Sequence, residues 1–140
     1  MTFGLETLYA DLLRDEGSRD RPYRDTVGKL TIGIGHNLDD VPISPRAIRV
    51  LWEDDIEAHW RGLQRALPWV LTLDPLRQRV LLNMAFNLGV PGLLAFKTTL
   101  EHVRAGRFDR AADAMLHSLW AKQVGARAQR LAAQMRTGLA

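Results

Sequence analysis

Apolar residues recur at spacings of three and four along most of the chain, which is the pattern of amphipathic helices. Leucines at four positions between 5 and 13 predict a first helix that ends near Gly17. A long second helix is predicted over 44–67. Ser44 followed by Pro45 is typical of a helix start, and Pro68 ends the pattern.

The C-terminal half is predicted to contain four further helices, separated by glycine and proline. They are expected at Asp74–Leu88 and at about 98–104, 108–120 and 125–136. Gly89 interrupts the first of these helices, and Gly106 and Gly125 separate the others.

Between the first two helices the pattern changes to that of short strands. Residues 23–35 predict a small antiparallel hairpin with a glycine turn at Gly28. Gly33 and Gly35 alternate with isoleucines there. Because glycine weakens a strand, they suggest the close approach of another backbone or a ligand.

These elements predict an α+β fold that is predominantly helical. We expect one domain over 1–140 with two lobes. The N-terminal lobe is a small hairpin lobe at about 13–43, and the helix at 44–67 bridges it to an all-helical lobe made of 68–140 together with 1–12. A cleft between two such lobes would suit an extended substrate.

The composition narrows the chemistry. Of 140 residues, 46% are hydrophobic and 25% are charged, which is typical of a globular protein with its own core. The absence of cysteine excludes disulfides and thiolate ligands. The four histidines do not form an H-E-x-x-H motif, so we expect no metal site and no cofactor.

The net charge of +3 leaves two interpretations of the basic C-terminal half. It is either a solvated surface or a surface that attracts a polyanion such as nucleic acid, anionic lipid or a wall polymer. No segment approaches the roughly 20 apolar residues of a membrane span, and the first residues do not have the pattern of a secretory signal.

Glu16, Asp25 and Thr31 are the candidate catalytic residues. Asp25 follows Glu16 by nine positions and Thr31 follows Asp25 by six, so a helix end packed against a hairpin could gather all three. Hydrolysis of a glycosidic bond needs a carboxylic acid to protonate the leaving oxygen and a carboxylate on the opposite side of the sugar ring. By spacing alone, the two could equally be solvated members of the sixteen acidic residues.

Three segments in order resemble the catalytic signature of the T-even phage lysozymes, glycoside hydrolase family twenty-four. They are residues 14–17 (RDEG), 23–26 (YRDT) and 31–36 (TIGIGH). The resemblance continues through 82–89 (LNMAFNLG) and covers roughly 8–138, nearly the whole chain.

The resemblance implies a lysozyme-like fold and an endolysin that cleaves the β-1,4 bond between N-acetylmuramic acid and N-acetylglucosamine of peptidoglycan. It implies that Glu16 is the general acid, that Asp25 is the second carboxylate and that Thr31 positions the attacking water. The family is inverting, which fits attack by water from the face opposite the leaving group.

The resemblance also assigns supporting roles. Asn37, Phe86 and Thr99 match positions that contact substrate, although Phe86 also suits a core position. The other matches are Arg127, as the partner of Glu16; Asn87 and Trp120, as supporting residues; and His36 with Asp55, as a structural ion pair.

This sequence departs from the family pattern at three places. The segment between His36 and Ser44 is much shorter, so the hairpin lobe is expected to be trimmed and its cleft more open. Ala114 stands where the family has a cleft asparagine, and Leu119 where it has an arginine. These changes concern substrate subsites and leave the three catalytic positions intact.

Two rival functions remain at this point. One is a wall-binding module of the same fold with weak or no catalysis, and the other is a membrane-active cationic helical protein. We expect peptidoglycan as the partner, an added affinity of the basic helices for anionic membrane or lipopolysaccharide, no nucleic acid, and a monomer. We expect synthesis in a host cytoplasm, with access to the wall once the membrane is permeabilised.

Overall fold

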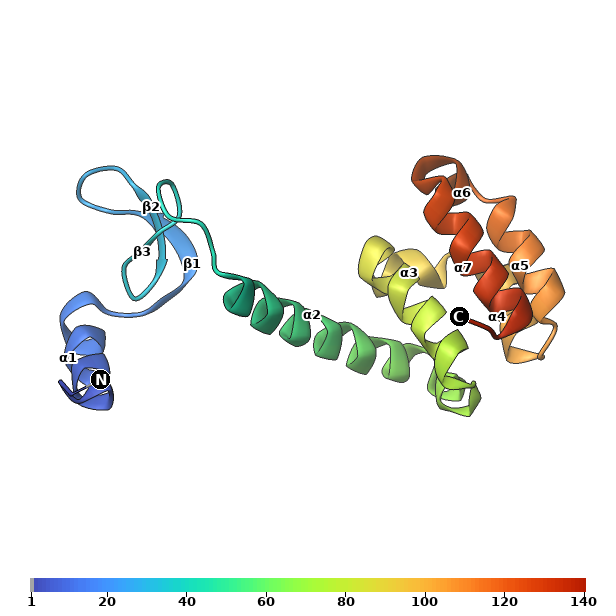
Figure 1. Cartoon of the computed structure of the whole chain (residues 1–140). Coiled ribbons are helices and arrows are strands. Elements are labelled where there is room, and N and C mark those ends of the chain that lie inside the picture. The colour runs from blue at the N-terminus through green and yellow to red at the C-terminus, as the bar shows by residue number, and fades with distance from the viewer. Residues whose placement is uncertain (1) are drawn as a thin grey trace. The chain divides into compact units, whose positions relative to one another are not determined.

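The computed structural model describes residues 2–140, which contain seven α-helices, one 3-10 helix and three short strands (Figure 1). The predominantly helical α+β class predicted from the sequence is therefore confirmed. The chain forms two compact units, the first ending at Val50 and the second comprising Leu51–Ala140. The two units are described separately, so the assignment of residues 1–12 to the helical lobe of a single domain stays a prediction.

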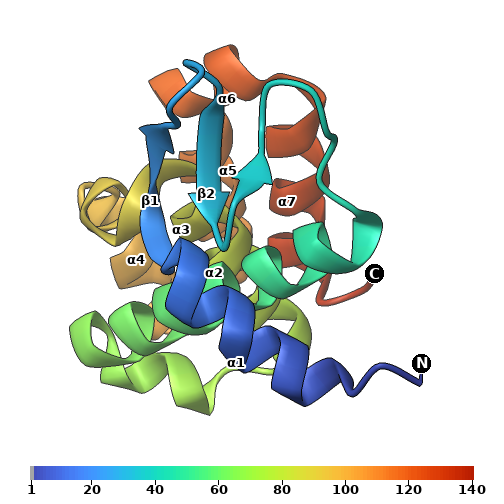
Figure 2. The same ribbon diagram turned by 90° about the vertical axis from the view of Figure 1, so that its left-hand side faces the viewer.

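The first unit combines one helix with a small sheet. Its elements are α1 (Leu5–Glu16), β1 (Arg19–Arg24), β2 (Leu30–Gly33) and β3 (His36–Asn37). The strands are antiparallel in the order β1-β2-β3, and β1 and β2 lie side by side in Figure 2. The predicted hairpin is therefore present, and β3 extends it to a three-stranded sheet. Thr31 on β2 lies opposite Tyr23 on one side and Asn37 on the other.

Gly33 and Gly35 have a conformational role. Their φ values are 65° and 71°, in the left-handed region that glycine adopts without steric cost. They form the tight turn from β2 into β3, and no atom outside their chain neighbours lies within 4 Å of the position of a Cβ on either. Within the first unit, then, their positive φ accounts for these glycines rather than a neighbouring backbone, and the approach of a ligand stays a prediction.

The second unit is entirely helical. It begins within α2 (Pro45–Ala66), whose bounds match the predicted long helix. Ser44 caps α2 as predicted, because its Oγ accepts a hydrogen bond of 3.1 Å from the N–H of Ala47. The remaining elements are η1 (Pro68–Thr72), α3 (Pro75–Leu94), α4 (Lys97–Arg104), α5 (Phe108–Leu116), α6 (Leu119–Val124) and α7 (Ala126–Thr137).

The core of this unit surrounds α3. Its fully buried side chains include Val80, Leu81 and Met84. Figure 1 shows α5 and α7 lying side by side, and small residues such as Ala112 and Ala132 are buried on them. Burying a valine, leucine or methionine side chain contributes about 1.5–3 kcal/mol, so the apolar face of α3 anchors the unit.

Two helix boundaries differ from the prediction. The backbone of Gly89 is non-helical, with φ 75° and ψ 156°, so the predicted break exists, but the chain turns helical again as far as Leu94. The predicted helix over 108–120 is wrong, because α5 ends at Leu116. The Oγ of Ser118 accepts a hydrogen bond of 3.1 Å from the N–H of Ala121 and starts α6 as a separate helix.

No single helix within residues 2–140 has both the length and the apolar composition to cross a bilayer. Only α3 and α4 taken together, which meet at a bend of 103°, reach that length and composition.

Arg77 joins three helices of the second unit. Its side chain is 13% exposed, and Nη1 lies 3.1 Å from Oδ1 of Asp74, the residue that caps α3. Nε donates to the carbonyl of Met135 at 2.7 Å and Nη2 to that of Arg136 at 3.1 Å, so the guanidinium satisfies carbonyls at the end of α7. It also lies 3.6 Å from the ring centroid of Phe108 on α5.

We predict that Arg77→Ala lowers the free energy of unfolding by about 3 kcal/mol, because it leaves two carbonyls of α7 without their donor and removes the guanidinium from Oδ1 of Asp74. Urea denaturation monitored by circular dichroism measures the change. Arg110→Ala is the matched control, since Arg110 is exposed and its loss should cost less than about 0.5 kcal/mol. Equal stabilities of the two variants would contradict the role of Arg77.

We also predict a pH dependence from Asp74. Burial raises the pKa of this carboxyl. Hydrogen bonds from the backbone and the guanidinium of Arg77 lower the pKa by more than burial raises it, so the pKa lies below 3.8. A carboxyl whose pKa is lower in the folded state than in the unfolded state stabilises the fold above pH 3.8. This contribution is lost as the pH falls through the pKa of the folded state. Asp74→Asn should therefore destabilise the protein at neutral pH, and the difference from wild type should shrink below pH 3.8. A difference that stays constant down to about pH 2 would contradict this.

Candidate active site

The three predicted catalytic residues line one pocket in the first unit. Its volume is about 430 Å³, and Glu16 comes from the end of α1, Asp25 from the turn after β1 and Thr31 from β2. The full lining is Glu16, Arg19, Tyr23, Arg24, Asp25, Thr26, Thr31 and Gly35. A helix end, a turn and a strand therefore gather residues that are spread over sixteen positions of the sequence.

Glu16 owes its place to the end of α1. Gly17, the C-cap, adopts φ 72° and its N–H donates to the carbonyl of Leu13 at 3.0 Å, so the helix ends at Glu16. The chain then turns directly into β1. Glu16 is thus the last residue of α1, is exposed and lines the pocket.

Asp25 is held by the backbone of its own turn. Its Oδ1 accepts hydrogen bonds from the N–H of Val27 at 2.9 Å and of Lys29 at 2.8 Å. The turn is closed by the N–H of Asp25 donating to the carbonyl of Lys29 at 2.9 Å and by the N–H of Gly28 donating to the carbonyl of Asp25 at 3.0 Å. Among the described residues both of these hydrogen bonds fall on Oδ1, so the lone pairs of Oδ2 remain for another donor.

Thr31 is buried, with 3% of its surface exposed. Its Oγ1 donates a hydrogen bond of 2.9 Å to the carbonyl of Lys29. A hydroxyl has one hydrogen and two acceptor lone pairs, so this bond leaves Thr31 as an acceptor toward the pocket. The main chain of Lys29 thus binds the side chains of both Asp25 and Thr31.

Two arginines and a tyrosine on the pocket wall were not predicted as site residues. Arg19 lies over the ring of Tyr23 at 4.3 Å, and Nη1 of Arg24 donates to the carbonyl of Gly28 at 3.2 Å. The signal that could have found Arg19 and Tyr23 is their spacing of four on one strand, which puts them on the same face. They make this wall cationic and aromatic.

Asn37, predicted to contact substrate, uses its side chain within its own loop. Its Oδ1 accepts the N–H groups of Asp39 and Asp40, both at 3.0 Å, and its Nδ2 donates to Oδ2 of Asp40 at 2.9 Å. Asn37 is also absent from the lining of the catalytic pocket. Its contact with substrate stays a prediction, and its observed contacts order the loop.

Two predicted residues of the second unit, Thr99 and Trp120, line one pocket of about 420 Å³, and a third, Asn87, binds Trp120. Nε1 of Trp120 donates to Oδ1 of Asn87 at 2.7 Å, and its ring packs edge-on against Phe96 with centroids 6.0 Å apart. Thr99 and Trp120 are both 3% exposed. The pocket is lined in part by Ala114 and Leu119, the two departures from the family pattern.

Phe86 and Arg127 line another pocket of the second unit, of about 450 Å³. The guanidinium of Arg127 donates to Oδ1 of Asn83 through Nε at 3.0 Å and Nη2 at 2.8 Å. Phe86 is 40% exposed, and its ring centroid lies 5.3 Å from that of His59. Phe86 is therefore not a core residue of this unit, and the pairing of Arg127 with Glu16 stays a prediction.

His36 and Asp55 also belong to different units, so their ion pair stays a prediction. In the first unit, Nε2 of His36 is buried without a hydrogen-bond partner among the described residues. Such an atom is costly unless a donor, an acceptor or water reaches it.

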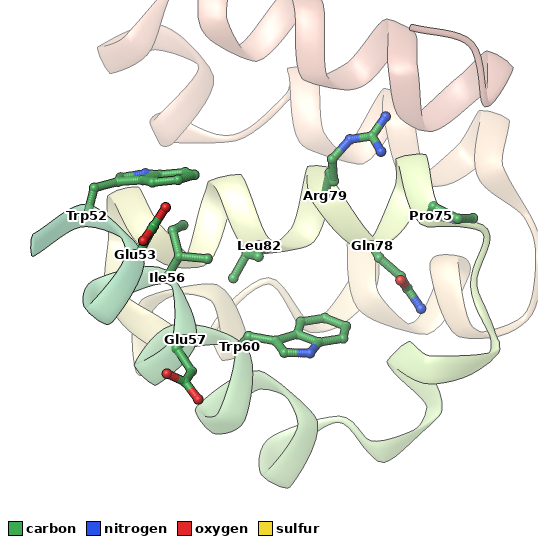
Figure 3. Close-up of a pocket in the computed structure, with 9 residues that line it drawn as sticks. All are labelled: Trp52, Glu53, Ile56, Glu57, Trp60, Pro75, Gln78, Arg79 and Leu82. Carbon is green, nitrogen blue, oxygen red and sulfur yellow. The ribbon is translucent and has the colours of Figure 1, made fainter. Parts of the chain in front are cut away.

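A further pocket of about 360 Å³ lies between α2 and α3 of the second unit (Figure 3). Trp52, Ile56, Trp60 and Leu82 give it an apolar wall. None of the residues labelled in Figure 3 is a predicted site residue. Its polar lining residues are Glu53, Glu57, Gln78 and Arg79. None of them belongs to the family signature, so the pocket of the first unit remains the candidate active site.

Known proteins are similar to this chain over most of its length. A family model described as phage lysozyme matches residues 14–137, a range that includes all three candidate catalytic residues. The chain is 32% identical to the pre-baseplate central spike protein Gp5 of Enterobacteria phage T4, over 91% of this chain but 27% of that protein.

Two other relatives are named as lysozyme or endolysin. The chain is 28% identical to probable T4-type lysozyme 1 of Dictyostelium discoideum, over 91% of this chain and 93% of that protein. It is 32% identical to an endolysin of Bacillus phage B103, over 79% of this chain and 42% of that protein. The chain belongs to the phage lysozyme family, a family of glycoside hydrolases.

Proposed function

We propose that this chain hydrolyses the β-1,4 bond between N-acetylmuramic acid and N-acetylglucosamine in bacterial peptidoglycan, with inversion at the anomeric carbon. The observation that carries the proposal is the pocket of the first unit, where Glu16, Asp25 and Thr31 meet. Membership of the phage lysozyme family supports the class of reaction.

Glu16 acts as the general acid. It lines the pocket at the end of α1 and is exposed, so a glycosidic oxygen can approach its carboxyl group. As the bond between the anomeric carbon and that oxygen breaks, the proton of Glu16 passes to the oxygen, and the leaving sugar departs as an alcohol.

Asp25 and Thr31 hold the attacking water. The water donates one hydrogen to Oδ2 of Asp25 and the other to Oγ1 of Thr31, whose own hydrogen is bound to the carbonyl of Lys29. The oxygen lone pair is then free to attack the anomeric carbon from the face opposite the leaving group. Asp25 takes the proton that the water loses, so one water is consumed for each bond cleaved.

The second unit contributes substrate contacts in this proposal. The pocket lined by Thr99 and Trp120 and the exposed ring of Phe86 offer apolar and hydroxyl surface to a glycan or its peptide. Exposed cations on α4 to α7 favour anionic membrane or lipopolysaccharide as a further partner. They are Lys97, Arg104, Arg107, Arg110, Lys122 and Arg130.

In cells, this activity would lyse a bacterial host. We place synthesis in the host cytoplasm and action at the wall after the membrane has been permeabilised. The alternative is a wall-binding or membrane-active protein of the same family with weak catalysis, which the exposed cations would also serve.

We predict that Glu16→Gln lowers the rate of reducing-end formation from purified glycan strands by about 10³-fold, because the amide has no proton to give to the leaving oxygen. Glu6→Gln is the matched control, since Glu6 is an exposed glutamate in the first turn of the same helix. The control should keep the wild-type rate.

The same variant separates the alternatives. If Glu16→Gln cleaves glycan at the wild-type rate, Glu16 is not the acid. If wild type forms no reducing ends but both wild type and Glu16→Gln release dye from anionic vesicles, the chain is membrane-active and the hydrolase proposal is wrong.

We predict that Thr31→Val lowers kcat by about 10²-fold, because valine fills the buried site but offers no acceptor to the water. Thr31→Ser keeps the hydroxyl and should stay within about tenfold of wild type. Proton NMR of the first product should show the α-anomer, as inversion of a β bond requires. Equal rates for the valine and serine variants, or a β-anomer formed first, would contradict the assigned role.

A further inference from the structure

We propose that Asp39, in the loop after β3, is a positioning residue that holds the turn carrying Asp25 and Thr31. The proposal rests on the function proposed above, since it concerns how the water-binding pair is held. Asp39 does not line the catalytic pocket, so its effect would pass through the backbone.

The backbone of Lys29 is the element to be held. Its N–H donates to Oδ1 of Asp25 at 2.8 Å. Its carbonyl accepts the hydroxyl of Thr31 at 2.9 Å and the N–H of Asp25 at 2.9 Å. A shift of the Lys29 backbone would therefore change the distance between the carboxylate of Asp25 and the hydroxyl of Thr31, the two groups that accept hydrogen bonds from the water.

Asp39 fixes the residue that follows. Its Oδ2 accepts the N–H of Leu30 at 2.8 Å, and the carbonyl of Leu30 accepts the N–H of Leu38 at 2.7 Å. Both main-chain groups of Leu30 are thus bound to the loop. Nη1 of Arg24 lies 3.5 Å from the same Oδ2 and 3.2 Å from the carbonyl of Gly28, so Asp39 is tied to the turn a second time.

Asp40 and Asn37 hold Asp39 in place. Oδ2 of Asp40 lies 3.0 Å from Nζ of Lys29, a second contact between loop and turn. The hydrogen bond between these two side chains lowers the pKa of Asp40 and raises the pKa of Lys29, as expected for two groups that stabilise each other's charged form. Asn37 binds the N–H groups of both aspartates through Oδ1, which orders the short loop.

The chemistry explains why this bracing matters. To bind the water in the orientation for attack, Oδ2 of Asp25 and Oγ1 of Thr31 must keep a fixed distance from one another. A misplacement of about 1 Å can lower the rate about 10²-fold. The loop segment 38–40 binds the main chain of Leu30 and the side chain of Lys29, and these contacts limit such a shift. The shortened segment after His36 is thus part of the site's support.

The test compares Asp39→Ala with Asp39→Asn on soluble peptidoglycan glycan strands. Alanine leaves the N–H of Leu30 without its acceptor, so kcat should fall at least about tenfold while KM changes less than about twofold. Asparagine keeps an acceptor oxygen for Leu30, so it should recover kcat to within about threefold of wild type. Asp20→Ala is the charge-matched control, because Asp20 is an exposed carboxylate on β1 outside the pocket lining.

Wild-type kcat in Asp39→Ala, an equal loss in Asp20→Ala, or no recovery in Asp39→Asn would each overturn the proposal. Asp25→Asn, run in parallel, tests the proposed function itself. If Asp25→Asn is inactive and Asp39→Ala is fully active, only the bracing role fails.

A second measurement does not need activity. Amide hydrogen exchange by NMR should be faster at Val27 and Lys29 in Asp39→Ala than in wild type and in Asp20→Ala, because these N–H groups bind Asp25 in the braced turn. Unchanged exchange would overturn the proposal even if the enzyme proved inactive on glycan, so the two failures can be told apart.

Discussion

The hydrogen bonds at Lys29 set the geometry of the candidate active site. One residue's N–H fixes the carboxylate of Asp25, and its carbonyl fixes the hydroxyl of Thr31. These bonds favour one rotamer of each side chain, so a carboxylate and a threonine six positions apart are held relative to the same backbone. The rest of the first unit serves this arrangement: β1 and β3 flank the strand that carries Thr31, and the end of α1 brings Glu16 to the same pocket.

Much of the fold follows from local patterns in the sequence. Serine and proline at 44 and 45, with Pro68 at the other end, defined α2 almost to the residue, because caps and prolines act through the nearest backbone groups. Gly28 and the alternation around Ile32 predicted the hairpin for the same reason. The three catalytic candidates were found by their order in a family signature and then met in one pocket.

Other features depend on contacts that a linear pattern does not contain. The two-residue strand β3 is too short to have a period, and the break between α5 and α6 depends on Ser118 capping the second helix where an apolar run suggested continuity. Asn37 matched a substrate contact by position, but the shortened loop gives its amide two backbone N–H partners. Asp39 stood in no motif, since its importance comes from Leu30, nine positions earlier in the chain.

Thr31 shows how burial and chemistry combine in this site. A buried hydroxyl is costly unless it is hydrogen-bonded, and the carbonyl of Lys29 satisfies its hydrogen. Its lone pairs remain, and a water that donates to them and to Oδ2 of Asp25 would satisfy both groups at once. The same water is the nucleophile of an inverting hydrolysis. The polar groups that the fold must satisfy in this pocket are therefore those that hold the reactant, so stability of the turn and catalysis place the same demand on the sequence.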